Sequence, residues 1–207
     1  MIKVGINGFG RIGRLALRVI LQKYKNQLQP VIINTSGKIE AAGWAHLFTY
    51  DTVYGKYKGQ VTVAGQEMVV DGVNILTTGE KDPAKIPWGT RETQVVIEST
   101  GVFRQFDQVS LHLRDTVKKV IVSAPPKDDK IPMYIIGVNE KNLGQEQIIS
   151  CASCTTNSLG PIVKVIDQEF GIAKALMTTV HAYTADQELL DGSHKDLRRA
   201  RAAAVNI

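Results

Sequence analysis

Short apolar runs alternate with a segment of helical periodicity near the start of the chain. Residues 3–7 and 30–34 are apolar almost throughout, and the apolar side chains of residues 11–25 recur three and four positions apart. This pattern predicts a strand, a helix and a second strand, the βαβ unit in which the two strands run parallel. Strands that are apolar without alternation are expected in a sheet that is covered on both faces.

The same alternation continues to residue 150. Three further apolar runs predict strands, at residues 94–97, 119–122 and 133–137. Residues 103–117 are expected to form a crossover helix, and residues 60–63 and 67–76 a small antiparallel pair. The fold class is therefore α/β, a Rossmann-type doubly wound parallel sheet over residues 1–150. Beyond it, residues 154–170 predict a helix that Gly171 ends, and residues 174–183 predict a long strand.

Composition adds limits on the class of protein. The chain has 207 residues, 43% of them hydrophobic, and a net charge of +5. At about 150 residues per domain this length corresponds to about 1.4 domains. There is no apolar stretch long enough to span a membrane and no signal-peptide pattern at the N-terminus, so we expect a cytoplasmic protein. The excess positive charge is spread through residues 1–150 without interleaved aromatic residues, so nucleic-acid binding is not indicated.

The first motif with a chemical meaning is Gly-x-Gly-x-x-Gly at residues 8–13. It follows a predicted strand and opens a predicted helix, which is the context of a dinucleotide-binding site. The glycines allow the backbone to approach a pyrophosphate, and the helix N-terminus presents N–H groups to it. An ordinary glycine-rich connection is the alternative.

The residues that follow the second strand bear on the choice of cofactor. A dinucleotide site usually has a carboxylate there, which binds the ribose 2′-hydroxyl and repels a 2′-phosphate. This chain has Asn34 and Thr35, followed by Ser36 and Lys38. The sequence therefore leaves NAD and NADP both open as cofactors.

A second motif places Cys154 at the start of the helix predicted over residues 154–170. A helix N-terminus lowers the pKa of a cysteine thiol and so favours the nucleophilic thiolate. His181 lies 27 residues further on, and a histidine that meets the thiol in the fold would act as its general base. The alternative is a buried structural cysteine and a core histidine.

Several stretches together carry a resemblance to one family. They are INGFGRIGR at residues 6–14, ASCTTN at 152–157, TVHAYT at 179–184 and HKDLRRARAAA at 194–204. In these stretches the chain resembles the phosphorylating glyceraldehyde-3-phosphate dehydrogenases. The resemblance implies a domain boundary after residue 150, with residues 151–207 as the beginning of an α+β catalytic domain that is truncated relative to the family. It also implies a homotetramer.

The resemblance further implies a reaction and its residues. Cys154 would attack glyceraldehyde 3-phosphate with His181 as base, hydride would pass to NAD(P), and inorganic phosphate would release 1,3-bisphosphoglycerate, a step of glycolysis. The residues implied to bind the cofactor are Gly8, Gly10, Arg11, Ile12, Gly13, Asn34, Thr35, Lys81, Thr100, Gly101 and Ser123. Those implied to bind substrate or phosphate are Ser153, Cys154, Thr155, Thr184, Asp186 and Arg199.

Other interpretations stay open beside this one. An erythrose-4-phosphate dehydrogenase shares the same motifs, and a dinucleotide-binding fragment without catalysis would also fit the length. The family usually has asparagine where Cys151 stands, so a Cys151–Cys154 disulfide could block the nucleophile on oxidation. No metal site is expected, because two thiols without further ligands are too few. His112, on the predicted crossover helix, is expected at the surface.

Overall fold

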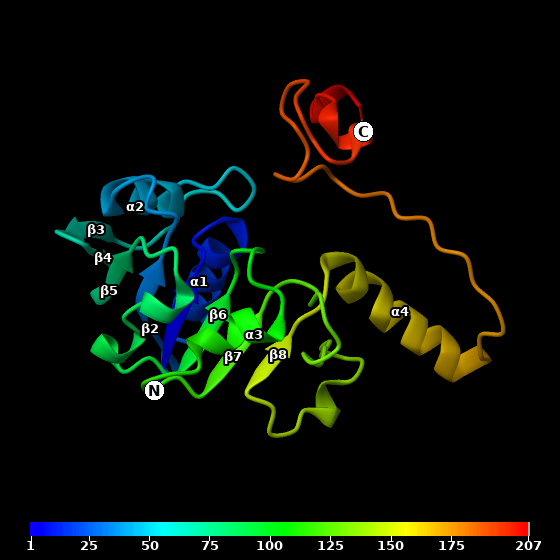
Figure 1. The fold of residues 1–207 in the computed structure, drawn as a ribbon, viewed down its shortest axis with the longest axis horizontal. Helices are drawn as coiled ribbons and strands as arrows, with labels where there is room; N and C mark the ends of the chain where they lie inside the picture. The colour runs from blue at the N-terminus through cyan, green and yellow to red at the C-terminus, as the bar shows by residue number, and fades with distance from the viewer. Residues whose placement is uncertain (207) are drawn as a thin grey trace. The chain divides into compact units, whose positions relative to one another are not determined.

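A single mixed sheet organises the computed structural model, which describes residues 1–206. Its strands are β1 (Ile2–Asn7), β2 (Leu28–Asn34), β3 (Val61–Ala64), β4 (Glu67–Val70), β5 (Val73–Thr78), β6 (Val95–Glu98), β7 (Lys119–Val122) and β8 (Ile148–Ser150). They lie in the order β3-β4-β5-β2-β1-β6-β7-β8, and only the β3–β4 and β4–β5 pairs are antiparallel. This confirms the predicted Rossmann-type α/β fold (Figure 1).

Helices and short 3₁₀ turns connect the strands. The α-helices are α1 (Arg11–Lys23), α2 (Ala41–Thr49), α3 (Phe106–Val109) and α4 (Cys154–Phe170). Within the described residues the 3₁₀ turns are η1 (Pro83–Lys85), η2 (Trp88–Arg91), η3 (Ser110–His112), η4 (Glu140–Asn142), η5 (Leu197–Ala200) and η6 (Ala203–Val205). No helix within residues 1–206 is long and apolar enough to cross a membrane.

The apolar strands have a core on each face of the sheet. Ile32 and Ile33 are adjacent in β2 and fully buried, yet they belong to different clusters. Ile33 packs with Leu17 of α1, whereas Ile32 packs with Val109 of α3. Successive side chains of a strand point to opposite faces, which explains why this strand shows no polar alternation.

Three of the elements predicted within residues 1–150 differ from the observed ones. The segment at residues 67–76 is two strands, because Asp71 and Gly72 both have positive φ and make a tight hairpin turn. The crossover helix is only α3 followed by η3, since Arg114 donates to the carbonyl oxygen of Ile86 and Asp115 adopts a left-handed conformation. The predicted strand at residues 133–137 was wrong apart from one bridge between Met133 and Ser150, and β8 pairs with β7 instead.

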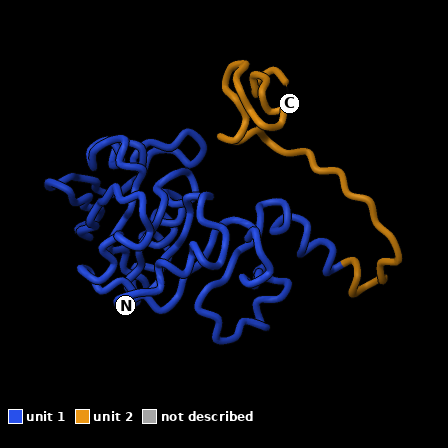
Figure 2. Tube along the Cα trace, viewed as in Figure 1, with its two compact units in different colours: residues 1–165 blue, residues 166–207 orange. Residues whose placement is uncertain are grey.

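The chain divides into two compact units, residues 1–165 and 166–207 (Figure 2). Helix α4 has the predicted bounds, and Gly171 follows it with φ 71°. The predicted strand at residues 174–183 was wrong, because these residues have no regular secondary structure. A strand needs a neighbour to pair with, and none of the described residues from 166 to 206 forms one. The predicted domain boundary after residue 150 stays a prediction.

Candidate active site

The Gly-x-Gly-x-x-Gly motif forms the turn between β1 and α1. Gly8 has φ 90°, and a Cβ at this position would lie 2.6 Å from the backbone nitrogen of Thr100. A Cβ on Gly13 would lie 2.1 Å from the carbonyl oxygen of Gly8. Gly10 precedes α1 without a side-chain cap, and the first turn of α1 has no acidic residue. The N-terminus of α1 is therefore suited to a pyrophosphate, which it would bind through backbone N–H groups.

A cavity of about 480 Å³ opens beside this turn, at the carboxyl ends of the parallel strands. Of the residues predicted to bind the cofactor, six line it: Gly8, Gly10, Asn34, Thr35, Lys81 and Thr100. Arg11, Ile12, Gly13, Gly101 and Ser123 do not line it. Its other walls come from residues that sequence reasoning did not single out: Asn7, Phe9, Trp44, Glu80, Ser99, Val102 and Phe103. The position of a crevice at these strand ends fits a dinucleotide.

Arg11, a predicted cofactor-binding residue, forms an ion pair with Asp51. Both guanidinium Nη atoms donate to the Asp51 carboxylate, at 2.7 and 3.1 Å. These bonds, with backbone N–H groups of Tyr54 and Val53, hold the pKa of Asp51 well below its usual range. Arg11 therefore fixes the loop after α2 against the start of α1, with its charge already paired.

The side chain of Asn34 makes four hydrogen bonds within the protein. Its amide nitrogen donates to Asn7 Oδ1 and to the Glu80 carbonyl oxygen, both at 2.8 Å. Its amide oxygen accepts from the Thr78 hydroxyl at 2.7 Å and from the Glu80 backbone nitrogen at 2.9 Å. The amide has no further donor for a ribose, so Asn34 shapes the cavity through its neighbours.

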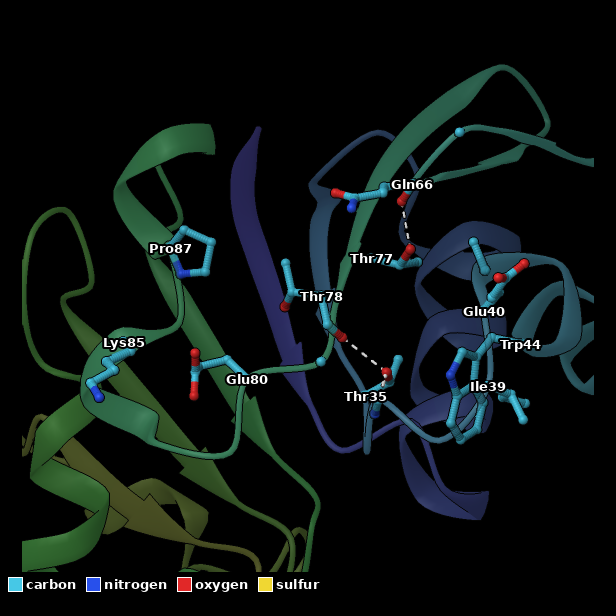
Figure 3. A pocket seen from close by; sticks show the side chains of 14 residues that line it. Thr35, Ile39, Glu40, Trp44, Gln66, Thr77, Thr78, Glu80, Lys85 and Pro87 are labelled. Carbon is cyan, nitrogen blue, oxygen red and sulfur yellow. Dashed lines mark hydrogen bonds between the residues drawn. The ribbon is translucent and has the colours of Figure 1, made fainter.

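A second cavity of about 760 Å³ adjoins the first and shares Thr35, Trp44 and Glu80 with it. Figure 3 shows Glu80 and Lys85 on one side of this space and Trp44 on the other. The Thr35 hydroxyl donates to the Thr78 carbonyl oxygen at 2.9 Å. Trp44 Nε1 is buried and has no hydrogen-bond acceptor among the described residues.

The turn before α4 presents Cys154. Ser153 Oγ accepts from the Thr156 backbone nitrogen at 3.0 Å, which caps the helix. Ala152 adopts a left-handed conformation with φ 58° and is buried, so the chain turns sharply just before the thiol. Cys154 is exposed at the positive end of a 17-residue helix, with Thr155 beside it.

Cys151 differs from Cys154 in its surroundings. Its backbone nitrogen donates to the Val122 carbonyl oxygen at 2.9 Å, which places it just beyond the sheet. Local burial raises the pKa of the Cys151 thiol, although the residue as a whole is exposed. Cys151 and Cys154 are not joined in a disulfide in this structure.

The unit of residues 166–207 carries the other predicted catalytic residues. A cavity of about 580 Å³ within it is lined by His181 and Arg199, together with Arg198 and Arg201. Arg199 forms an ion pair with Asp186, and hydrogen bonds from Arg198 lower the pKa of Asp196 to about 2. Thr184 and Asp186 do not line this cavity. Arg198 and Arg201 are paired in the same way, with Asp196 and Asp191, so these guanidinium groups would have to exchange a carboxylate for an anionic substrate.

The predicted active-site residues belong to different units. Cys154, Ser153 and Thr155 lie in residues 1–165, whereas His181 and Arg199 lie in residues 166–207. The meeting of Cys154 with His181 therefore stays a prediction. Among the described residues, no group of three or more His, Cys, Asp or Glu side chains could hold a metal ion.

One further sequence prediction was wrong. His112 is fully buried, not at the surface, because η3 turns it beneath the sheet. Its ring contacts Trp88 and Glu98. The signal that could have found this contact is the position of Glu98 at the end of an apolar strand, where a carboxylate needs buried donors.

Comparison with known proteins assigns the two parts of the chain. Residues 2–106 match the family model described as "Glyceraldehyde 3-phosphate dehydrogenase, NAD binding domain". Residues 153–207 match the family model described as "Glyceraldehyde 3-phosphate dehydrogenase, C-terminal domain". Glyceraldehyde-3-phosphate dehydrogenase 1 of Kluyveromyces lactis and glyceraldehyde-3-phosphate dehydrogenase of Thermotoga maritima are each 50% identical over the whole chain. The chloroplastic glyceraldehyde-3-phosphate dehydrogenase B of Pisum sativum is 49% identical. The chain spans 62% of the first two proteins and 46% of the third.

Proposed function

This chain belongs to the glyceraldehyde-3-phosphate dehydrogenase family, and from that membership we propose that the protein oxidises glyceraldehyde 3-phosphate to 1,3-bisphosphoglycerate. The observation that carries the proposal is an exposed cysteine at the N-terminus of α4, in the same chain as a family NAD-binding domain. The uncapped N-terminus of α1 and the adjoining cavity fit a dinucleotide.

In the proposed reaction Cys154 Sγ attacks the aldehyde carbon and His181 takes the hydroxyl proton of the resulting hemithioacetal. NAD(P), which the residues around the glycine-rich turn would hold, would supply the hydride acceptor, and this oxidation would leave a thioester on Cys154. Phosphate then attacks the thioester carbon, the acyl phosphate leaves, and the thiolate of Cys154 is restored. Arg199 would hold an anionic group close to the reacting carbon.

The assay is NADH or NADPH formation from glyceraldehyde 3-phosphate, cofactor and phosphate. It is run on the 207-residue chain beside a polypeptide of the relatives' length. Turnover that requires phosphate supports the proposal, and its absence from both polypeptides contradicts it. Binding without turnover in the shorter chain alone would support the alternative of a catalytically incomplete dinucleotide-binding fragment. Erythrose 4-phosphate in place of the triose tests the tetrose alternative.

We also propose that the protein accepts both NAD and NADP. The cavity of about 480 Å³ beside the glycine-rich turn, here called the cofactor cavity, is lined by Thr35, Ser36, Lys38 and Lys81. Glu80 is the one carboxylate among its lining residues. Lys38→Glu is expected to weaken binding of NADP about tenfold relative to NAD, because a 2′-phosphate would lose an ammonium and meet a carboxylate. The measurement is the ratio of the two dissociation constants. Lys118→Glu, the same charge change at the amino end of β7, should leave the ratio unchanged; an equal effect of both variants would contradict the proposal.

Cys151 would act as a resolving thiol under oxidation. Peroxide would convert the Cys154 thiolate to a sulfenic acid, and the Cys151 thiol would displace hydroxide from it, which combines with the thiol proton as water, to form a disulfide. We expect wild-type activity lost to peroxide to return fully with dithiothreitol, and activity of Cys151→Ser to return only in part. Peptide mass spectrometry reports the disulfide. Equal recovery in both proteins, without a Cys151–Cys154 disulfide, would contradict this role.

The place and assembly of the protein are further proposals. We propose a cytoplasmic location, and two of the relatives are chloroplastic by name. A homotetramer follows from the family resemblance, and light scattering on a polypeptide of the relatives' length measures it directly.

A further inference from the structure

A line of buried polar side chains crosses four neighbouring strand ends beneath the cofactor cavity. Its members are Thr78 of β5, Asn34 of β2, Asn7 of β1 and Glu98 of β6, followed by His112 and Trp88. From Asn34 to Trp88 each side chain is at least 97% buried. Buried polar groups of this kind need full hydrogen bonding, and a network of them holds one arrangement.

Every hydrogen bond along this line donates towards Glu98, and the 3.5 Å approach of Asn7 Nδ2 to His112 Nε2 brings together two atoms that both donate to that carboxylate. On one side the Thr78 hydroxyl donates to Asn34, whose amide donates to Asn7 Oδ1. Asn7 Nδ2 then donates to Glu98 Oε2 at 2.5 Å. Because a carboxylate only accepts, Glu98 fixes which way each of the two asparagine amides points.

On the other side Trp88 sets the tautomer of His112. Trp88 Nε1 can only donate, and it lies 3.2 Å from His112 Nδ1, which must therefore be the unprotonated ring nitrogen. The ring proton is then on Nε2, which lies 3.2 Å from Glu98 Oε2. His112 thus donates to Glu98 without contacting the cavity itself.

Glu98 also joins the two walls of the cavity. Its Oε1 accepts from the backbone nitrogen of Thr100 at 2.8 Å and from the Thr100 hydroxyl. Ser99 lies between Glu98 and Thr100 in the sequence, and its Oγ donates to the carbonyl oxygen of Gly8, on the glycine-rich turn, at 2.8 Å. The segment from Glu98 to Thr100 is therefore tied to the turn that is expected to receive the pyrophosphate.

We propose that Glu98 and His112 are positioning residues for the dinucleotide: His112 orients the Glu98 carboxylate, and Glu98 holds the Thr100 wall and the Asn7–Asn34 floor in the binding arrangement. The proposal rests on the proposed function, since it assumes that this cavity binds NAD(P). It requires neither residue to touch the cofactor.

Two substitutions at His112 separate positioning from packing. His112→Gln places an amide N–H where Nε2–H lies and keeps the donor to Glu98, whereas His112→Leu fills similar space without a donor. We expect the dissociation constant of NAD to rise about tenfold in His112→Leu and to stay within about twofold of wild type in His112→Gln. Isothermal titration calorimetry gives the constants, and thermal unfolding is recorded for each protein.

A core variant away from the cavity controls for stability alone. Met68 is fully buried in β4 and lines neither the cavity of about 480 Å³ nor the adjoining one of about 760 Å³. Met68→Ala should therefore lower Tm without weakening the binding of NAD. Equal dissociation constants for His112→Leu and His112→Gln, or an equal rise in Met68→Ala, would overturn the proposal. Wild-type protein that does not bind NAD at all would instead overturn the proposed function.

A measurement on the wild-type protein keeps the inference testable if the His112 variants do not fold. Nitrogen chemical shifts of the His112 ring report which nitrogen carries the proton, and we expect Nε2. A proton on Nδ1 would reverse the direction of donation and overturn the role assigned to His112.

Discussion

Replacing Cys154 with serine is expected to remove phosphate-dependent oxidation almost completely, by about a thousandfold or more in kcat. A serine hydroxyl at this position stays protonated, because an alcohol is a far weaker acid than a thiol. The N-terminus of α4 stabilises a thiolate but does not ionise an alcohol. The measurement is the rate of NADH formation by Cys154→Ser and by the wild type. Both are made in whichever polypeptide, the 207-residue chain or the one of the relatives' length, turns over as wild type.

Cys151→Ser is the matched control, because it makes the same chemical change three residues earlier at an exposed position. It should keep activity within about threefold of wild type, as it removes no group proposed for the reaction. NAD affinity should be unchanged in both variants. Without phosphate, mass spectrometry should find a covalent acyl adduct on the wild type and none on Cys154→Ser. Turnover of Cys154→Ser within tenfold of wild type would show that another group is the nucleophile.

The parts of the fold that the sequence predicted best depend on local patterns. The βαβ unit around Gly8 and the helix α4 follow from periodicity and from glycines at points where the backbone needs positive φ. The hairpin at Asp71 and Gly72 had a local signal too, an Asp-Gly pair between two apolar runs, which was read as one strand. The short crossover was less accessible, because its end is set by Arg114 reaching the carbonyl oxygen of Ile86, a contact distant in sequence.

The site shows the same limit. The glycine motif pointed to Gly8 and Gly10 and the family resemblance to Thr100, and all three line the cavity of about 480 Å³. The sequence did not point to Trp44 or Glu80, which also line this cavity. Trp44 lies on α2, and Glu80 follows β5, which pairs with β2. The surface prediction for His112 was wrong because it assumed one long crossover helix, whereas the segment is one α-turn and one 3₁₀ turn. Polar contacts between strand ends depend on tertiary register, which a single sequence does not display.

The largest effect on stability is expected from Gly13→Ala in the Gly-x-Gly-x-x-Gly motif of residues 8–13. The expected change in Tm differs between the glycines of this motif. A methyl group on Gly13 would meet the carbonyl oxygen of Gly8 at 2.1 Å, so α1 must move away from β1 in Gly13→Ala. Overpacking of this kind costs about 3 kcal/mol, and in a chain of this size Tm should fall by roughly 6–12 °C.

Gly10→Ala is the control within the motif, and its expected effect is on binding. Gly10 has φ −70°, and its Cβ would meet nothing within 4 Å, so Tm should stay within about 2 °C of wild type. Gly10 lines the cavity and immediately precedes α1, so an added methyl group is expected to crowd a pyrophosphate at this N-terminus and to weaken NAD binding at least about tenfold. Thermal unfolding and calorimetric titration of the two variants give the comparison. A wild-type Tm in Gly13→Ala would contradict the close approach of α1 to the turn, and unchanged NAD affinity in Gly10→Ala would place the pyrophosphate elsewhere.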